Sequence, residues 1–340
     1  VRDSSDADRY GNIVAICDID DVRLAEAAAK YPGAKKFNDY RELLDQLDSK
    51  IDAVVVSAPD HHHAPACVRA MRMGKHIYCQ KPLTHTVAEA RLMRETAREH
   101  GVVTQMGNQG TAADGFRSGV ELIRSGAIGD IREVHAWTNR PFKYWKQAPD
   151  ITARPPERPP VPEHVHWNLF LGPAPERPYH PVYHPHDWRG WWAFGTGSLG
   201  DMACHTANLA FMSLKLGLPH RVSAVSGEVN PETYPGWATI TYEFGQRDQM
   251  PPVRFTWYEG AKDDQRNLPD ADLLHGQEIP ASGMLFVGDE GSILTPDDYG
   301  AKQVLLPVEK FQDFERPAPT LRRLGEGNND DNHKREWIRA

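Results

Sequence analysis

The sequence is poor in three features that often reveal a protein's class: cysteine pairs, long apolar runs and an excess of positive charge. Its 340 residues include four cysteines, none in a C-x-x-C spacing, which gives no support to a zinc knuckle or a disulfide framework. No stretch approaches the roughly 20 apolar residues that span a bilayer. The net charge of −8 argues against nucleic acid as a partner, because the chain offers no basic surface for phosphates.

What the chain does contain is enough residues for two ordinary domains, with 40% hydrophobic and 25% charged residues. It starts at Val1 without a methionine, and residues 336–340 fall within an expected helix. We therefore expect the chain to be truncated at both ends, so that any export signal would lie upstream of Val1.

Short apolar runs alternate with amphipathic helical runs between residues 12 and 110. The expected strands are 13–17, 51–56, 76–79 and 102–106, and the expected helices are 22–31, 40–47, 64–73 and 87–100. The run at 51–56 is nearly all apolar, as in a strand that is buried on both faces of a parallel sheet. This alternation predicts a doubly wound parallel sheet, a Rossmann-like domain at residues 1–110.

The pattern changes after residue 110. Helices are expected at 116–123 and 201–216, a long irregular loop in the proline-rich stretch 141–190, and several short alternating strands within 221–306. These features predict an α+β domain at residues 111–340, built on a mostly antiparallel sheet. The fold class is therefore α/β with a second, α+β domain.

Asp18 follows the first expected strand, where an acidic side chain accepts hydrogen bonds from an adenosine ribose. A carboxylate there also repels a 2′-phosphate, which favours NAD over NADP as the cofactor. A helix N-cap at Asp18 or Asp20 is an equally good explanation. The glycine-rich phosphate loop of such a domain comes one strand and one turn earlier, and we expect it upstream of Val1.

A second loop begins where the buried strand at 51–56 ends. Its sequence is Ser57-Ala58-Pro59-Asp60, followed by the three histidines at 61–63. Loops at the carboxyl ends of parallel strands face the ligand crevice, so we expect this loop and His63 to face the cofactor. Three adjacent histidines also suggest a metal, but neighbouring side chains point in different directions and cannot all bind one ion. No metal is therefore expected.

Two segments carry residues suited to proton transfer. Lys81 lies at a strand end before Pro82, where a lysine could hold a substrate hydroxyl and stabilise a developing alkoxide. Asp201 and His205 are four residues apart in an expected helix, so they share one helical face. The aspartate can orient the imidazole as a general base. Each residue alone has a plainer explanation: a turn lysine, a helix cap and a core histidine.

Together these segments resemble the Gfo/Idh/MocA family of oxidoreductases. The resemblance rests on Gly-Lys-His-Ile-Tyr-Cys-Gln-Lys-Pro at 74–82 and Gly-Asp-Met-Ala-Cys-His at 200–205, and it extends over nearly the whole chain. Residues 167–175 and 187–189 are similar to a subgroup with a long proline-rich insertion. The resemblance implies that Lys81, Asp201 and His205 are catalytic, and that hydride moves between NAD and a sugar or polyol hydroxyl.

The resemblance also implies a homo-oligomer, a dimer or tetramer formed through the open face of the second sheet. Members of the subgroup often carry a twin-arginine export signal. Two positions depart from the family pattern: Gln80 stands in place of a glutamate and Asn208 in place of a frequent aspartate. Glutamine keeps the shape and one acceptor oxygen but loses the charge beside Lys81.

The proline-rich loop contributes candidate substrate ligands. Aromatic faces suit the apolar face of a pyranose and a guanidinium can bind hydroxyls, so we expect Trp188, Arg189 and His186 to contact substrate together with Lys81, Asp201 and His205. Packing is the plainer explanation for most aromatic residues of the loop, and residues 179–186 could instead hold a metal. The full set of expected cofactor ligands is Asp18, Ile19, Ser57, Ala58, Pro59, His63, Gln80, Lys81 and Asn108.

Three functions stay open at this point. An NAD-dependent sugar or polyol oxidoreductase is the favoured hypothesis. The enlarged aromatic loop, large enough to cover a glycoside, also allows an NAD-retaining, redox-assisted glycoside hydrolase or lyase. The third is a non-catalytic sugar-binding relative that has lost its dinucleotide site.

Overall fold

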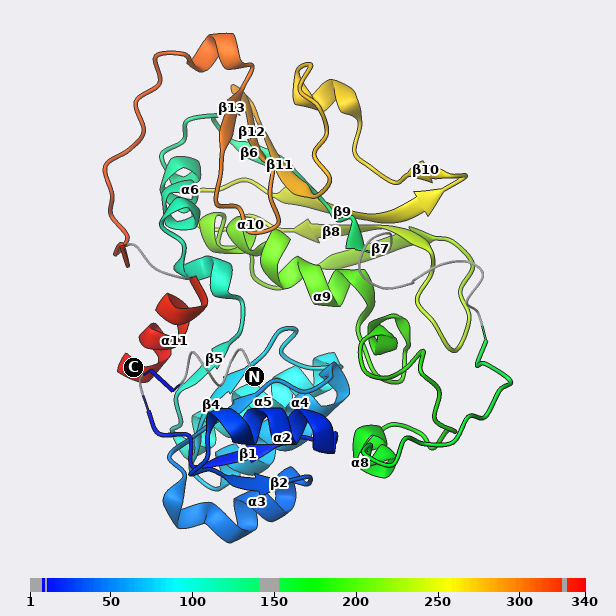
Figure 1. Cartoon of the computed structure of the whole chain (residues 1–340). Coiled ribbons are helices and arrows are strands. Elements are labelled where there is room, and N and C mark those ends of the chain that lie inside the picture. Colours follow the sequence, from blue (N-terminus) through cyan, green and yellow to red (C-terminus); the bar gives the residue numbers. More distant parts are fainter. Residues whose placement is uncertain (1–7, 10, 141–152, 326–328) are drawn as a thin grey trace. The chain divides into compact units, whose positions relative to one another are not determined.

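The computed structural model describes residues 8–9, 11–140, 153–325 and 329–340, and its contacts divide the chain into two compact units (Figure 1). The first unit comprises residues 1–108, 154–196 and 330–340, and the second comprises residues 109–153 and 197–329. The predicted domain boundaries stay a prediction, but the proline-rich segment 154–196 and the C-terminal helix are grouped with the first unit. Residues 141–152 of the predicted loop lie outside the described residues.

In the described part of the first unit, short parallel strands form the sheets: β1 (Ala15–Cys17), β2 (Lys35–Phe37), β3 (Ala53–Val56), β4 (His76–Cys79) and β5 (Thr104–Met106). They pair as two separate sheets, β1-β2 and β3-β4-β5, and every pair is parallel. The parallel α/β arrangement expected from the alternating pattern is confirmed. The sequence of β2, Lys-Lys-Phe, lacks an apolar run, so the apolar pattern does not predict this strand.

The helices of this part of the chain are α2 (Asp21–Lys30), α3 (Tyr40–Leu47), α4 (Asp60–Arg72) and α5 (Val87–His100), with a 3-10 turn η1 (Asp48–Lys50). Helix α4 begins at Asp60, four residues before the expected start, so the three histidines lie in its first turn. Helix α5 begins with a capping box between Thr86 and Glu89. Apolar residues of α3, α4 and β4, such as Leu44, Met71 and Ile77, form a buried core.

The C-terminal helix α11 (Asn329–Arg339) contains the end of the chain and packs on β4 and β5. The hydroxyl of Tyr78 lies 3.0 Å from His333 Nδ1, and Gln105 Nε2 donates to the carbonyl of His333 at 2.7 Å. The ammonium of Lys334 lies 4.9 Å from the centre of the Tyr78 ring. These contacts explain why residues 330–340 belong to the first unit.

Aromatic residues give the proline-rich segment a small core of its own. It contains helix α8 (Trp167–Leu171) and the turn η3 (Asp187–Gly190). The rings of Trp167 and Phe170 stack at 4.8 Å, and the Arg177 guanidinium lies 5.3 Å from the Tyr183 ring and 4.8 Å from the Phe194 ring. The plainer explanation for most of these aromatic residues, packing of a loop with little regular structure, is what the structure shows.

An eight-stranded sheet forms the second unit. Its main path runs β13-β12-β11-β6-β9-β8-β7, and the short β10 pairs with β9. Among the described residues of this sheet, the β6-β9 pair alone is parallel, so the expected mostly antiparallel sheet is confirmed. The strands are β6 (Ile131–Trp137), β7 (Arg221–Ser226), β8 (Trp237–Phe244), β9 (Val253–Lys262), β10 (Gln265–Arg266), β11 (Gly283–Gly288), β12 (Gly291–Thr295) and β13 (Val304–Leu306).

Helices cover one face of this sheet (Figure 1). They are α6 (Asp114–Arg124), α9 (Gly197–Thr206) and α10 (Asn208–Ser213), and the 3-10 turns of the unit are η2 (Gln109–Ala112), η4 (Ala271–Leu274) and η5 (Val308–Phe311). Phe116, Val120 and Leu209 of these helices pack on strand residues such as Phe255 and Phe286. The single helix expected at 201–216 is instead two helices, and the first begins at Gly197.

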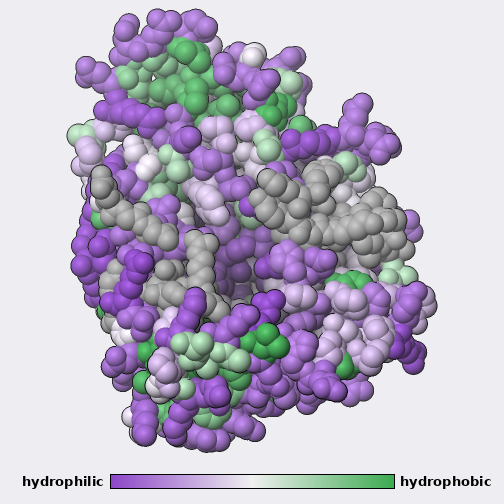
Figure 2. Space-filling model, in the orientation of Figure 1, coloured by the Kyte–Doolittle hydropathy of each residue, from purple (hydrophilic) through white to green (hydrophobic). Residues whose placement is uncertain are grey.

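No helix among the described residues is long and apolar enough to cross a membrane. Hydrophilic residues predominate on the face drawn in Figure 2. An apolar area on that face lies near the β11–β13 side of the second unit.

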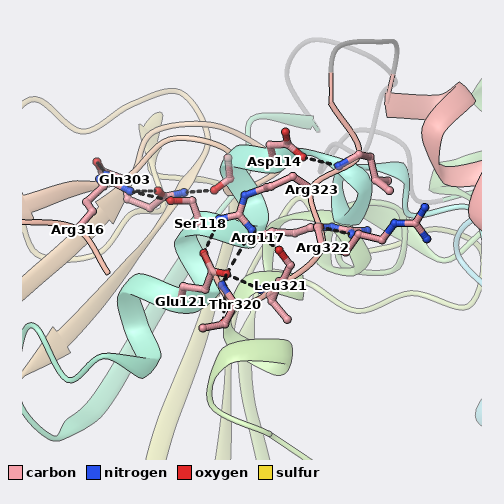
Figure 3. A network of polar contacts seen from close by, with 12 residues as sticks. Asp114, Arg117, Ser118, Glu121, Gln303, Arg316, Thr320, Leu321, Arg322 and Arg323 are labelled. Carbon is pink, nitrogen blue, oxygen red and sulfur yellow. Dashed lines mark hydrogen bonds and ion pairs between the residues drawn. The ribbon is translucent and has the colours of Figure 1, made fainter. Parts of the chain in front are cut away.

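A polar network holds the irregular segment after η5 onto α6 (Figure 3). The carboxylate of Glu121 accepts the backbone N–H groups of Thr320 at 2.5 Å and Leu321 at 2.6 Å, and it pairs with the guanidinium of Arg323. The hydrogen bond from Arg323, helped by the backbone donors, lowers the pKa of Glu121 to about 2. One buried carboxylate therefore fixes a segment that has no regular structure.

We expect Glu121→Gln to lower the free energy of unfolding of the second unit by about 3 kcal/mol, because it leaves Arg323 without its charged partner. The difference in the free energy of unfolding between the parent and the variant should shrink as the pH falls from about 4.5 toward 2. Protonation of Glu121 in the parent removes the same charge that the substitution removes. Urea denaturation measures both. Glu309→Gln, at an exposed position of η5, is the control. An equal loss of unfolding free energy in the two variants would contradict the role of Glu121 in holding the segment after η5.

Candidate active site

The residues expected to bind NAD lie at the carboxyl ends of parallel strands in the first unit. Asp18 and Ile19 follow β1, Ser57, Ala58 and Pro59 follow β3, Gln80 and Lys81 follow β4, and Asn108 follows β5 by one intervening residue. Ser57 and Ala58 are exposed, while Asp18 and Asn108 are half-buried. Open parallel sheets hold their ligands at this edge, so hydroxyl and carboxylate groups suited to a dinucleotide gather on one edge of the unit.

Asp18 is not the cap of helix α2. The N-cap is Asp20, whose carboxylate accepts the N–H groups of Val22 at 2.9 Å and Arg23 at 3.3 Å. Asp18 Oδ1 accepts the N–H of Asp20 at 3.0 Å, and burial raises the pKa of Asp18. Asp18 is therefore not used as the helix cap, and its binding of a ribose with two hydroxyl groups stays a prediction.

His63 joins the loop after β3 to the loop after β4. Its Nε2 lies 2.7 Å from the carbonyl oxygen of Ala58, and its Nδ1 lies 2.7 Å from the carbonyl oxygen of Pro82. The side chain is 1% exposed, and burial lowers its pKa to about 4. Both ring nitrogens face backbone carbonyl oxygens, and the neutral ring donates its single N–H to one of them, so His63 lies between the two loops and turns no ring nitrogen toward a cofactor.

The other two adjacent histidines bind the proline-rich segment. Nε2 of His61 and Nε2 of His62 lie 2.8 and 2.7 Å from the carbonyl oxygen of Phe170, and His61 Nδ1 lies 3.2 Å from the carbonyl oxygen of Phe194. Burial lowers the pKa of His61 to about 3. Within the described ranges, no three His, Cys, Asp or Glu side chains are grouped so that they could hold a metal ion.

Gln80 and Lys81 share the end of β4. The backbone N–H of Lys81 donates to Gln80 Oε1 at 3.2 Å. A Cβ on Gly107 would lie 2.6 Å from that same oxygen, so a glycine after β5 lets the Gln80 amide lie against the neighbouring strand end. The neutral amide therefore occupies a fixed place beside the half-buried Lys81, and the Lys81–Pro82 peptide bond is cis.

Helix α9 carries Asp201 and His205 on its buried side. Asp201 is 6% exposed and His205 is 4% exposed, and their spacing places both on one helical face, as predicted. Asp201 is the fifth residue of the helix, which excludes the plainer explanation that it is the N-cap. Gly197 begins the helix with a φ of 63°, and a Cβ there would lie 2.8 Å from the Tyr234 ring.

Tyr299 is a neighbour of His205 that the sequence did not reveal. The two rings lie 5.0 Å apart at 67°, an edge-to-face contact. Asp297 fixes the turn that carries Tyr299, because its carboxylate accepts the N–H groups of Tyr299 at 2.8 Å, Ala301 at 3.1 Å and Lys302 at 3.0 Å. The sequence Pro-Asp-Asp-Tyr-Gly indicates a turn, but nothing in it links that turn to α9.

Asn208, the second departure from the family pattern, donates from Nδ2 to Thr111 Oγ1 at 2.8 Å. It joins the start of α10 to η2 within the second unit. Residues 195–200 also have the spacing G-x-G-x-x-G. The residues before them form a turn rather than a strand, so this is not the phosphate loop of a Rossmann unit.

The three residues predicted to contact substrate from the proline-rich loop lie together in and beside η3. The Arg189 guanidinium lies 4.3 Å from the centre of the Trp188 ring and donates to the carbonyl of His186 at 3.0 Å. Trp188 is 6% exposed, whereas His186 is exposed. Arg189 and His186 are therefore the accessible members of the group, and all three belong to the first unit, as does Lys81.

Comparisons with known proteins assign the chain to a family. Residues 1–108 match the family described as "Oxidoreductase family, NAD-binding Rossmann fold", and residues 121–250 match "Oxidoreductase family, C-terminal alpha/beta domain". The chain belongs to the Gfo/Idh/MocA oxidoreductase family. Its first 108 residues are the NAD-binding Rossmann domain of that family, and NAD is the cofactor that this domain binds.

Individual relatives agree with this family. The chain is 33% identical over 125 residues to inositol 2-dehydrogenase of Salmonella paratyphi B, a match that covers 36% of this chain and 37% of that enzyme. The chain thus spans little more than a third of the curated relative. The WlbA dehydrogenase of Bordetella pertussis, solved with NADH and UDP-GlcNAcA, is 17% identical with a TM-score of 0.59, covering 88% of this chain and 75% of that one.

A levoglucosan dehydrogenase solved with NADH and levoglucosan has the same fold. It is 20% identical with a TM-score of 0.57, and the match covers 96% of this chain and 79% of that one. These names are those of dehydrogenases, and the comparisons give no support to the redox-assisted glycosidase. The fold and the family predicted from the sequence are confirmed.

The buried histidines make the stability of the first unit depend on pH. The pKa is about 4 for His63 when folded and about 6.5 when unfolded, so between these values the unfolded chain binds a proton that the folded chain does not. The contribution of His63 should therefore fall by about 2 kcal/mol as the pH is lowered from 7 to 5. Urea denaturation at several pH values measures this loss.

His63→Gln should flatten this pH dependence, because glutamine does not titrate. His100→Gln, at an exposed position at the end of α5, should leave it unchanged. An identical acid sensitivity in His63→Gln and the parent would show that the His63 ring is not held neutral.

Proposed function

We propose that the intact protein is an NAD-dependent oxidoreductase that transfers hydride between a sugar or polyol hydroxyl and nicotinamide. The observation that carries the proposal is the pair Asp201 and His205, buried on one face of α9 in a chain of this family. The inositol, levoglucosan and nucleotide-sugar dehydrogenases among its relatives support the substrate class.

The first unit would hold the cofactor. Asp18 would bind the adenosine ribose, and the residues after β3, β4 and β5 would line the remainder of the site: Ile19, Ser57, Ala58, Pro59, Gln80, Lys81 and Asn108. When bound, NAD supplies the acceptor or donor of hydride. The carboxylate of Asp18 also disfavours the 2′-phosphate of NADP, because like charges repel.

The proton chemistry falls to three side chains. In oxidation, His205 takes the hydroxyl proton while hydride leaves the carbon that carries the hydroxyl, and a carbonyl is formed. Asp201 orients the imidazole from the same helical face. The Lys81 ammonium donates to the substrate oxygen and stabilises the negative charge that develops on it. The reverse reaction returns the proton from His205 to the carbonyl oxygen.

The proline-rich segment supplies the proposed specificity. Arg189 and His186 would bind substrate hydroxyls or a carboxylate. The Arg189 guanidinium packs against the face of the Trp188 ring, which holds it in place. The accessible groups are polar, which suits a hydroxylated ligand better than an apolar one.

We also propose a homo-oligomer formed through the sheet of the second unit. Support comes from β7, which is exposed along most of its length and carries Val222 and Val225 at 54% and 66% exposure. Sedimentation equilibrium tests this assembly. A monomer at micromolar concentration would contradict it.

Lys81→Ala in the intact protein should lower kcat/KM roughly 1,000-fold, because the substrate oxygen loses its cationic partner. His205→Asn should have an effect of similar size. The assay is NADH formation with a panel of cyclitols, aldoses and anhydrosugars, and circular dichroism verifies the fold. Lys30→Ala, at an exposed position on α2, is the control.

Unchanged NADH formation by Lys81→Ala would contradict the role of Lys81. Release of an aglycone from a glycoside without net NADH would contradict the proposed reaction while leaving the fold and cofactor assignments standing.

A further inference from the structure

Residue Val165 of the proline-rich segment is fixed to the chain just after β1. It forms an isolated antiparallel bridge with Asp20. Two backbone hydrogen bonds flank the bridge: Asp21 N to the carbonyl of His164 at 2.8 Å, and His166 N to the carbonyl of Ile19 at 2.9 Å. Backbone groups therefore join the segment to the residues that directly follow Asp18.

The same segment is fixed a second time, to the first turn of α4 after β3. His61 and His62 both direct Nε2 at the carbonyl oxygen of Phe170, at 2.8 and 2.7 Å. Gly172 makes room for this contact, since a Cβ there would lie 2.2 Å from His62 Cε1. Both histidines are buried, so the second attachment is shielded from water.

The two attachments lie on different sheets of the first unit. β1 pairs with β2 and β3 pairs with β4, and no ladder joins β1 to β3 among the described residues. Helices α2 and α4 both begin where a parallel strand ends, so both attachments lie at the carboxyl edge, where a dinucleotide binds. Residues 164–171 therefore cross this edge from the β1 side to the β3 side.

We propose that residues 164–171 are a further part of the dinucleotide site, where they close over the adenosine end beside Asp18 and Ile19 and slow dinucleotide release. The inference rests on the proposed NAD-dependent function. Two carboxylates lie beside histidines of this segment. Asp20 Oδ2 is 3.8 Å from His164 Nε2, and Asp21 Oδ1 is 3.1 Å from His166 Nε2. This acidic surrounding suits an unphosphorylated ribose.

Release kinetics test the proposal. The intact protein is loaded with NADH and mixed rapidly with excess NAD⁺, and the loss of bound NADH fluorescence gives the rate of release. His166→Pro removes the N–H that bonds Ile19 and keeps a backbone that proline tolerates, since φ of His166 is −83°. Gly172→Ala displaces His62 from Phe170. Each variant should release NADH about tenfold faster.

Two controls separate the attachments from general effects. His166→Ala keeps the backbone N–H and removes only the side-chain contact with Asp21, so it should release NADH more slowly than His166→Pro. Glu157→Pro introduces proline at an exposed position of the same segment and should match the parent.

The outcomes distinguish this inference from the function on which it rests. If the parent binds and turns over NADH but both variants release it at the parent rate, residues 164–171 do not slow dinucleotide release. The proposed oxidoreductase function then still stands. Tighter NADH binding in the variants would mean that residues 164–171 block the dinucleotide site, which also overturns the proposal that they slow its release. A parent that binds no NADH overturns the proposed function and this inference together.

Discussion

The His63 side chain makes the contacts on which the proposed ligand-binding edge of the first unit depends. It is buried in the first turn of α4, and its two ring nitrogens meet the carbonyl oxygens of Ala58 and Pro82. The loops after β3 and β4 are therefore set relative to each other, and the Lys81-Pro82 turn follows. Burial lowers the pKa of His63, so the ring is neutral: it faces both carbonyls from opposite sides and donates its single N–H to one of them.

Histidine serves the same purpose a second time in the neighbouring residues. His61 and His62 meet the carbonyl of Phe170, and aromatic packing around Phe170 gives the proline-rich segment its own core. A segment with little regular structure has many backbone groups to satisfy, and buried side chains supply the partners. The contacts of the three histidines in the described residues are thus made to backbone carbonyl groups of the first unit.

The sequence predicts the regular parts well, because apolar periodicity determines them. It predicts the parallel and antiparallel sheets, the strand-end positions of Asp18 and Lys81, and the shared face of Asp201 and His205. It does not predict that residues 154–196 join the first unit, or that Tyr299 meets His205, because both depend on contacts between residues distant in the chain. Strand β2 is not predicted, because its three residues are mostly polar and show no apolar pattern.

The proposed reaction moves hydride from a carbon of the substrate to nicotinamide. The most direct measurement uses the intact protein, NAD⁺ and a cyclitol or sugar deuterated at the carbon to be oxidised, with mass spectrometry of the reduced cofactor. We expect NADH to form and to carry the deuterium. Unlabelled NADH, or deuterium lost to water without NADH, would contradict it.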